Sequence, residues 1–331
     1  MSEFFFYSIF RLDFFCDLKY SKKIYQKTTE KGQVKMNYFG RELNEYKANL
    51  HTHSTISDGS MEPAKVIQVY ADAGYDVLAF TDHKKTNPVS TYDNRGMTLL
   101  SGMELHPTGP RDIMWHILGL GVPEDFIYPE PANGQAAVDA VNAVGGIAFC
   151  AHPYWCGFSS AEVATLQGIL GIEVYNTSTR YIGKEYNMQC WDELLDAGFR
   201  YNALAVDDMH GERDLFKGFK IILAEDNSPE SIMKALKKGD YYSSEGPRFT
   251  KITYENGFLS VDFTPVISAI GIMRKSRGYC QNIENMLGPG SENKEVSHME
   301  IDLSKIHDNY FRIQLKDTAG RMAWSNPIFL D

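Results

Sequence analysis

The chain of 331 residues is long enough to bury a substantial core, and its length suggests one large domain and a smaller one. Its formal net charge of −10 argues against a broad basic groove for nucleic acid, although divalent cations bound to the chain would still attract a short nucleotide. The five cysteines are odd in number and contain no Cys-x-x-Cys pair, so we expect a reducing, cytoplasmic setting without a cysteine zinc cluster.

The first 35 residues are predicted to stand apart from the rest of the chain. The apolar run at residues 4–10 is short, Arg11 interrupts it, and no basic segment precedes it, so it fits neither a membrane-spanning helix nor a signal peptide. Residues 23–35 are polar and rich in lysine, and Met36 follows them. Two interpretations stay open: Met36 is the true start, or residues 1–35 are a loosely attached extension. The intact mass of the natively expressed protein distinguishes them.

Residues 36–247 alternate between short apolar runs and segments with helical periodicity. Strands are expected at residues 47–53, 76–82, 98–104, 113–120, 146–152, 171–176, 202–208 and 219–224. Helices are expected at residues 60–73 with Ser60 as N-cap, and at 132–144, 160–167, 183–197 and 228–238. The first seven strands, with helices or loops between them, favour the α/β class and a small parallel barrel.

The character of the sequence changes after residue 247. Two alternating runs at residues 250–254 and 258–263 are joined by Asn256-Gly257, a strong signal for a β-hairpin. Further strands are expected at residues 269–274, 298–303 and 310–316, and a polar, exposed loop at 281–296. Residues 248–331 are therefore predicted to form a small, β-sandwich-like C-terminal domain.

Two histidines near the end of the first predicted strand suggest a metal site. On a strand, His51 and His53 project to the same side with Cα atoms roughly 6.6 Å apart, which allows two imidazoles to bind one ion. Asp58 lies in the following turn, just before Gly59, where it can fold back and offer an oxygen ligand.

More imidazoles and carboxylates occur where later apolar runs end. They are His83, Glu104, His116, His152, Asp208 and His210. In parallel α/β barrels that edge carries the active site. Imidazoles and carboxylates without thiolates suit Zn²⁺, Mn²⁺ or Fe²⁺. Nine such side chains exceed the needs of one four-ligand zinc site, so we expect two or three divalent ions that share bridging carboxylates.

These motifs, in their order and approximate spacing, resemble those of the PHP (polymerase and histidinol phosphatase) superfamily over residues 49–210. The resemblance implies a distorted (β/α)7 barrel. The double acid before Met209 and the β-rich tail resemble the two-domain branch near the carbaryl-hydrolase-like metallohydrolases. The Asp-x-His pattern of the family favours Asp208 over Asp207 as a ligand and leaves Asp207 a structural role. His106 is an alternative ligand to His116.

The PHP pattern also implies how the ligands divide among the ions. One ion would be held by His51, His53, Glu104 and Asp208, a second by Glu104, His116 and His152, and a third by Asp58, His83 and His210. The resemblance further implies a metal-dependent phosphoesterase in which a metal-bound hydroxide attacks phosphorus. Its expected substrates are small phosphomonoesters, nucleotides or short oligonucleotides, the last by 5′–3′ exonuclease-like trimming.

Several roles stay open at this point. His83 or His210 could deliver a proton to the leaving oxygen. Arg180 and Lys84 or Lys85 are candidate phosphate contacts, and Tyr154 and Trp155 follow a ligand and either line the pocket or pack in the core. The alternatives to a phosphoesterase are a metallohydrolase of non-phosphate esters, carbamates or amides, and a non-catalytic metal-stabilised binding module. No membrane partner is expected, and the sequence does not decide the oligomeric state.

Overall fold

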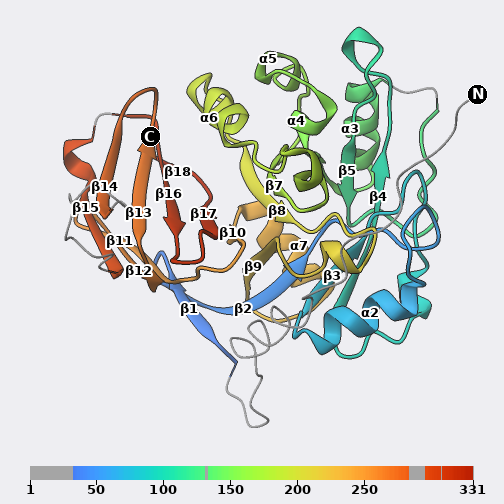
Figure 1. Ribbon diagram of the computed structural model, residues 1–331, viewed down its shortest axis with the longest axis horizontal. Helices are drawn as coiled ribbons and strands as arrows, with labels where there is room; N and C mark the ends of the chain where they lie inside the picture. The colour runs from blue at the N-terminus through green and yellow to red at the C-terminus, as the bar shows by residue number, and fades with distance from the viewer. Residues whose placement is uncertain (1–32, 131–132, 283–294, 307, 331) are drawn as a thin grey trace, which may run out of the picture. The chain divides into compact units, whose positions relative to one another are not determined.

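The computed structural model describes residues 33–130, 133–282, 295–306 and 308–330 (Figure 1). Most of the predicted N-terminal extension and most of the predicted polar loop at 281–296 lie outside these residues. Lys35 already belongs to strand β1 (Lys35–Tyr38), and the Gln33 side chain donates a hydrogen bond to the Glu45 carbonyl oxygen. Met36 is fully buried in this strand. Where the chain begins, and its division into two domains, stay predictions.

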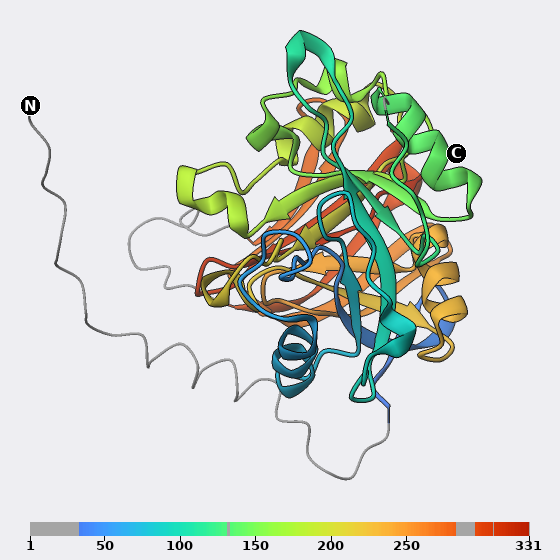
Figure 2. The same cartoon turned by 90° about the vertical axis from the view of Figure 1, so that its right-hand side faces the viewer.

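Seven strands pair in chain order. They are β2 (Arg41–Asn49), β3 (Val77–Phe80), β4 (Thr98–Leu105), β5 (Ile117–Leu120), β6 (Ile147–Cys150), β7 (Gly171–Asn176) and β8 (Asn202–Val206). A parallel bridge between Thr52 and Met209 joins the segments that follow β2 and β8. The fold is therefore mixed α/β, as expected, while the geometry of a (β/α)7 barrel remains a prediction. Figure 2 shows these strands from the side of β4 and β5.

The prediction that all seven strands are parallel is wrong for β5. This strand runs antiparallel to both β4 and β6, whereas β2–β3, β3–β4, β6–β7 and β7–β8 are parallel pairs. The reason lies in the connection between β4 and β5, which contains only a 3₁₀ turn, η2 (Pro110–Asp112). A parallel pairing needs a longer crossover, usually through a helix.

The helices lie outside these strands (Figure 1). They are α2 (Pro63–Asp72), α3 (Gly134–Ala143), α4 (Pro153–Cys156), α5 (Ser160–Val163), α6 (Met188–Asp196) and α7 (Pro229–Lys238). Helix α3 packs against β5 and β6, α6 against β7, and α7 against β9 (Phe219–Ala224). The predicted apolar face of α6 is confirmed, because Trp191, Leu194 and Leu195 are buried.

Two predicted helix starts are wrong because tertiary contacts claim the residues concerned. Helix α2 begins at Pro63 rather than at residue 61, since the Met61 carbonyl oxygen accepts a hydrogen bond from the Thr55 N–H instead of from the first turn of the helix. Helix α6 begins five residues later than expected. The segment before it pairs with β7 through a Tyr175–Tyr186 bridge and an Asn187 N–H···O=C Val174 hydrogen bond.

The remainder of the chain is mainly β-structure. It comprises β10 (Tyr241–Ser244), β11 (Phe249–Glu255), β12 (Phe258–Val266), β13 (Ser268–Met273), β14 (Gly278–Asn282), β15 (Val296–Asp302), β16 (Tyr310–Lys316), β17 (Met322–Ser325) and β18 (Ile328–Phe329). The β11–β12 hairpin occurs where expected, and Asn256 and Gly257 both have the positive φ that its turn requires. Pairing of β10 with β9 and of β1 with β11 joins these strands to the rest.

No helix in the described parts of the chain is both long and apolar enough to cross a membrane.

Candidate metal centre

His51 and His53 lie in an extended segment just beyond β2, and neighbouring strand ends hold this segment on both sides. The His53 N–H donates to the Met209 carbonyl oxygen, and the Thr52 N–H donates to Thr81 Oγ1 at 2.9 Å. Both imidazoles are fully buried. Their Nε2 atoms are 3.1 Å apart, so the two rings converge on one point as the His-x-His spacing predicted.

Asp58 reaches the same region from a tight loop. Its Oδ2 lies 3.4 Å from His83 Nε2, and its Oδ1 lies 3.5 Å from His210 Nε2. The loop returns so closely that a Cβ on Gly59 would stand 2.6 Å from the His53 carbonyl carbon, so only glycine fits there. Buried Asp82 fixes this loop, since it accepts hydrogen bonds from the backbone and hydroxyl groups of Ser54 and Ser57.

Glu104, at the end of β4, is the centre of the cluster and is 1 % exposed. Its Oε1 lies 2.7 Å from His116 Nδ1 and 3.3 Å from His152 Nε2. Its Oε2 lies 2.8 Å from His83 Nδ1 and 3.4 Å from the Nε2 atoms of both His51 and His53. One carboxylate therefore faces five imidazoles from two sides, as a bridging ligand would.

Asp208 closes the cluster from the end of β8. Its Oδ1 lies 3.1 Å from His53 Nε2, 3.2 Å from His51 Nε2 and 3.6 Å from His210 Nδ1. The structure thus brings together all nine side chains that the sequence suggested as ligands. We call them the ligand cluster: His51, His53, Asp58, His83, Glu104, His116, His152, Asp208 and His210.

Buried side-chain atoms in and beside the ligand cluster lack hydrogen-bond partners within the described part of the chain. They are Glu104 Oε2, Asp208 Oδ1, His83 Nδ1 and His106 Nε2. Buried polar atoms are nearly always hydrogen-bonded, and leaving one unpaired costs about 1–3 kcal/mol. Carboxylate oxygens and imidazole nitrogens that converge at one place are the ligand types that a divalent cation takes, so the residues present fit bound metal.

The donor atoms fall into four overlapping groups, in each of which the atoms lie within 4.8 Å of one another. The groups are His51–His53–Glu104, His53–Asp58–His83–His210, His116–His152–Cys156 and His83–Glu104–His106. The first three are close to the three sets that the PHP pattern implies. Cys156 was not considered from the sequence, although it follows His152 by four residues, one turn along α4.

Two ligands have strained backbone. His152 has φ 22° and Asp208 has φ 48°, in a region that residues other than glycine seldom occupy. Each such residue costs on the order of 1–3 kcal/mol, and strain of this kind concentrates at functional sites. At His152 the backbone N–H donates to Glu173 Oε2 at 2.9 Å, which helps to hold this geometry.

Glu173 is a part of the site that sequence reasoning missed. It is fully buried on β7, and its Oε1 lies 2.6 Å from His51 Nδ1. This contact turns His51 Nε2 towards the cluster, the usual role of a carboxylate behind a metal-binding histidine. The signal available in the sequence was a single acidic residue inside an otherwise apolar strand.

Carboxylates control the protonation of the imidazoles. Burial acts to lower the pKa of His51, but Asp208, Glu173 and Glu104 raise it well above its usual value. Burial likewise opposes protonation of His83, while Asp58 and Glu104 raise its pKa to about 9. Burial dominates at His53 and lowers its pKa to about 4. Because only the unprotonated imidazole binds metal, ion binding at His51 and His83 would release protons.

Asp207 faces away from the cluster. Its carboxylate accepts hydrogen bonds from the backbone N–H groups of Phe216, Lys217 and Gly218 and from the Tyr70 hydroxyl, at 2.7–3.0 Å. These contacts support the structural role expected for this residue.

The candidate substrate contacts differ in their surroundings. The Arg180 guanidinium donates to the Thr177 and Arg213 carbonyl oxygens, so these donors are already engaged by the chain. Lys84 Nζ lies 3.1 Å from Glu130 Oε1 at the surface. The Trp155 ring is partly exposed and stands edge-on to His116 and His152, with centroids 5.3 and 5.1 Å away. The roles of these residues stay predictions.

Comparison with known proteins gives local sequence matches and a match of fold. No protein-family model matches the chain. The chain is 37 % identical over 81 residues to phosphoribosyl 1,2-cyclic phosphate 1,2-diphosphodiesterase of Eggerthella lenta. This matched segment covers 23 % of this chain and 31 % of that protein. It is 36 % identical over 94 residues to 3′,5′-nucleoside bisphosphate phosphatase of Chromobacterium violaceum, covering 27 % and 32 %. The chain therefore spans about a third of the length of these curated relatives.

The structural match covers more of the chain. A two-domain protein of Bacteroides vulgatus, which contains a predicted PHP-like metal-dependent phosphoesterase, aligns with a TM-score of 0.50 and 15 % identity. The alignment covers 88 % of this chain and 95 % of that one. The resemblance to PHP-like phosphoesterases is therefore confirmed in fold, while the finer placement near carbaryl-hydrolase-like enzymes stays a prediction.

Proposed function

We propose that this chain, which resembles PHP-like phosphoesterases, is a metal-dependent hydrolase of phosphate esters. Its substrates would be small phosphomonoesters, nucleotides or short oligonucleotides. The two curated relatives are named for a phosphodiesterase and a bisphosphate phosphatase, which supports phosphate esters as the substrate class.

The observation that carries the proposal is the set of unpaired ligand atoms around Glu104 and Asp208. A purely structural cluster would be expected to pair these buried atoms within the chain, as Asp207 does. Two or three divalent ions, with Zn²⁺, Mn²⁺ and Fe²⁺ as the candidates, would satisfy them.

We divide the ligands among the ions as the PHP pattern implies. His51, His53, Glu104 and Asp208 would hold one ion, Glu104, His116 and His152 a second, and Asp58, His83 and His210 a third. When bound, such ions lower the pKa of water towards neutrality and neutralise charge on phosphate oxygens. The chain contributes the fixed positions of the ligands and the orientation of His51 by Glu173.

His83 and His210 are placed to move a proton. Their side chains are 24 % and 27 % exposed, whereas those of His51 and His53 are fully buried. Both imidazoles contact Asp58, which is itself half-exposed, so the three groups lie at the solvent-facing edge of the cluster. A leaving oxygen entering from solvent would meet these two histidines first, and either could protonate it.

The test is metal-dependent hydrolysis by the full chain. The protein is stripped of metal, reloaded separately with Mn²⁺, Zn²⁺ or Fe²⁺, and assayed on p-nitrophenyl phosphate, nucleotides, short oligonucleotides and carboxyl esters. We expect activity on phosphate esters that chelation removes and metal restores. The His51→Asn variant should lose it, and its matched control is His298→Asn. His298 also pairs with a carboxylate, Asp262, at 2.6 Å, but lies on the exposed part of β15.

Other outcomes would identify the alternatives. Activity on carboxyl esters or carbamates alone would replace the proposal with a non-phosphate metallohydrolase. Metal that raises the melting temperature of the chain without any activity on the panel would point to a binding module.

A further inference from the structure

A thiol stands beside two of the predicted ligands and has no part in the proposed chemistry. Cys156 Sγ lies 3.6 Å from His152 Nδ1. One donor atom from each of Cys156, His152 and His116 lies within 4.8 Å of the other two. Both histidines also approach Glu104 Oε1, His116 Nδ1 at 2.7 Å and His152 Nε2 at 3.3 Å. The sulfur therefore borders the three side chains that would hold one ion.

Helix α4 fixes the position of this sulfur. His152 is the N-cap of the helix, and Cys156 follows it by four residues, which places the thiol one turn further along. The Cys156 N–H donates to the His152 carbonyl oxygen at 3.2 Å, and the His152 N–H donates to Glu173 Oε2 at 2.9 Å. Backbone hydrogen bonds therefore hold the thiol and the imidazole within one short segment.

The donor group combines buried atoms with an accessible one. His152 and Glu104 are 3 % and 1 % exposed, whereas Cys156 is half-buried. Exclusion of water around Glu104 strengthens the attraction between its carboxylate and a cation. The accessibility of the sulfur allows the thiol to release its proton to solvent when an ion binds, because only the thiolate is a metal ligand.

The three other cysteines in the described part of the chain belong to no such group. Cys150 is fully buried on β6, and its Sγ lies 3.8 Å from the Ala151 carbonyl oxygen. Cys190 is half-buried on α6, and Cys280 is exposed on β14. The combination of a thiol with two imidazoles is therefore specific to the position of Cys156.

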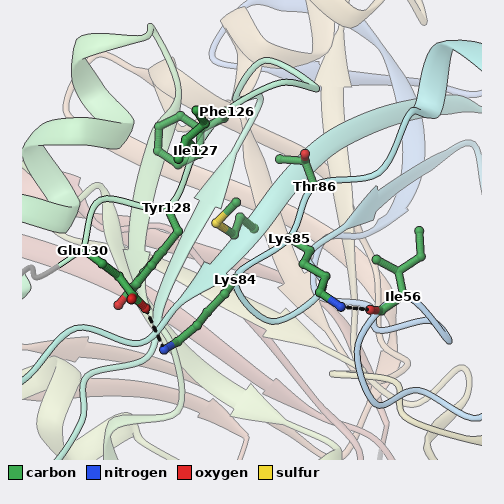
Figure 3. Close-up of a pocket in the computed structure, with 9 residues that line it drawn as sticks. Ile56, Lys84, Lys85, Thr86, Phe126, Ile127, Tyr128 and Glu130 are labelled. Atoms are coloured by element: carbon green, nitrogen blue, oxygen red, sulfur yellow. Dashed lines mark hydrogen bonds and ion pairs between the residues drawn. The ribbon is translucent and has the colours of Figure 1, made fainter.

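The open cleft beside the ligand cluster does not supply another thiolate (Figure 3). It has a volume of about 530 Å³, and its lining among the described residues contains no thiol and no imidazole. Its two lysines already have partners, since Lys84 Nζ lies 3.1 Å from Glu130 Oε1 and Lys85 Nζ donates to the Ile56 carbonyl oxygen. A sulfur ligand for the cluster therefore has to come from α4.

A thiolate changes which ion a metal site prefers. Imidazoles and carboxylates together suit Zn²⁺, Mn²⁺ or Fe²⁺. A thiolate is a soft ligand and favours Zn²⁺ over Mn²⁺, which is better served by carboxylate oxygens and water. One thiolate among the ligands would therefore make one ion position of the cluster different from the others.

From these observations we propose that Cys156 binds, as a thiolate, the ion that His116 and His152 hold. This position then takes a thiophilic divalent cation such as Zn²⁺ in preference to Mn²⁺, while the other ion positions have only imidazole and carboxylate ligands. The proposal rests on the metal binding of the proposed function and is independent of hydrolysis. A chain that binds metal without hydrolysing any phosphate ester would still contain this site.

The first experiment replaces the metal with Co²⁺ and records a spectrum. The full chain is stripped of metal with its thiols kept reduced, and Co²⁺ is then titrated in. We expect the near-ultraviolet charge-transfer band of sulfur-bound Co²⁺, and the complete loss of this band in Cys156→Ser. The matched control Cys190→Ser removes a half-buried thiol from α6 and should retain the band. Absence of the band in the wild type, or its persistence in Cys156→Ser, would overturn the proposal.

Metal affinities distinguish a ligand from a residue that only orients His152 through Nδ1. Competition with a chromophoric chelator gives the Kd values for Zn²⁺ and for Mn²⁺. In Cys156→Ser the Kd for Zn²⁺ should rise by about 10- to 100-fold, and the Kd for Mn²⁺ should rise much less. Equal weakening of the two ions would show that Cys156 positions the imidazole without binding metal, and would reject the proposal.

Chemical labelling of the wild type gives a test that no variant has to survive. The chain is treated with iodoacetamide with and without metal, and mass spectrometry compares Cys156 with the exposed Cys280. Zn²⁺ should suppress the labelling of Cys156 and leave that of Cys280 unchanged, and Mn²⁺ should suppress it less. Equal labelling of Cys156 with and without Zn²⁺ would contradict the proposal. The spectra, affinities and labelling use no substrate, so a failure of hydrolysis would reject the proposed function without deciding this site.

Discussion

Asp207 and Asp208 are neighbours in the chain and both are buried, yet they belong to two different regions of the molecule. Asp208 faces the ligand cluster, where its Oδ1 has three imidazole nitrogens around it and no hydrogen-bond partner among the described residues. Asp207 faces a hydrogen-bonded region that we call the supporting network, made of Asn49, Tyr70 and Asp207. The positive φ of Asp208 turns the chain so that the two carboxylates diverge.

The two regions also differ in electrostatics. Burial acts to raise the pKa of Asp208, but His51, His53 and His210 bring it well below its usual value. At Asp207 burial prevails, and the pKa is raised despite hydrogen bonds from backbone N–H groups and Tyr70. In the supporting network the buried polar groups form hydrogen bonds within the chain, whereas in the ligand cluster several of them do not. We therefore expect changes in the supporting network to affect stability, and changes in the ligand cluster to affect metal binding and activity.

The largest effect should come from Asp208→Asn. Loss of this charge removes a ligand from the centre of the cluster, and kcat/KM on phosphate esters should fall by about a hundredfold to a thousandfold, the scale of losing one preorganised electrostatic group. Steady-state kinetics and metal analysis of the purified variant are the measurements. Full metal content together with full activity would show that Asp208 is not a ligand.

The matched change is Asp207→Asn. Its new amide N–H₂ would face backbone donors instead of accepting from them, so the free energy of unfolding should fall by about 3 kcal/mol. Urea unfolding of the metal-free protein measures this loss, and the folded variant should bind as much metal as the wild type. If Asp207→Asn lost metal but not stability, the division between the two regions would be wrong.

Glu173→Gln tests the carboxylate that orients a ligand without binding metal itself. A neutral amide should hold His51 less firmly and make its Nε2 less basic, so metal affinity should fall about 10- to 100-fold. Competition with a chromophoric chelator measures the affinity. Glu162→Gln is the control, since Glu162 pairs with the half-exposed Arg111 and is not part of the ligand cluster. An affinity equal to that of the wild type would remove Glu173 from the site.

Glu245 belongs to neither region and tests how one buried carboxylate makes stability depend on pH. Burial raises its pKa to about 7, although the Met322 N–H and the Tyr186 hydroxyl donate hydrogen bonds to it. The usual pKa is 4.5, so between about pH 4.5 and pH 7 the folded state holds a proton that the unfolded state has lost. Stability from this group is fully present below pH 4.5 and is lost as the pH rises through 7, by about 3 kcal/mol.

The measurement is urea unfolding of the metal-free protein at pH 5 and pH 8. Glu245→Gln cannot ionise, so its loss of stability between these two pH values should be smaller than that of the wild type. Glu255→Gln, which changes an exposed residue of β11, should leave the pH dependence unchanged. An identical pH dependence in Glu245→Gln and the wild type would show that this carboxylate is ionised throughout.

Local patterns predicted much of the fold. Short, mainly apolar runs placed β7 and β9 at their observed bounds, and Asn256-Gly257 placed the first C-terminal hairpin. The direction of β5 was missed because the pattern of a strand does not state the direction of its partners. The start of α6 was missed because residues with adequate helical propensity pair with β7 instead.

The metal ligands could be predicted in the same way, because imidazole and carboxylate groups at the ends of strands can be recognised in the sequence. The structure places all nine together, which the sequence supported only through their order and family resemblance. The sequence did not reveal that Glu173 contacts His51, 122 positions away. Nor did it reveal that the guanidinium of Arg180 donates to nearby carbonyl oxygens. Both facts depend on contacts between distant segments.

By itself, the sequence determined which chemical groups this protein has for binding metal and which apolar segments carry them, because side-chain chemistry and periodicity are local properties. The tertiary structure alone decided which of two adjacent aspartates faces the cluster, which atoms remain without hydrogen-bond partners, and where the cleft with Lys84 opens. Those outcomes follow from how separate strand ends and loops pack together, and no single stretch of residues encodes them.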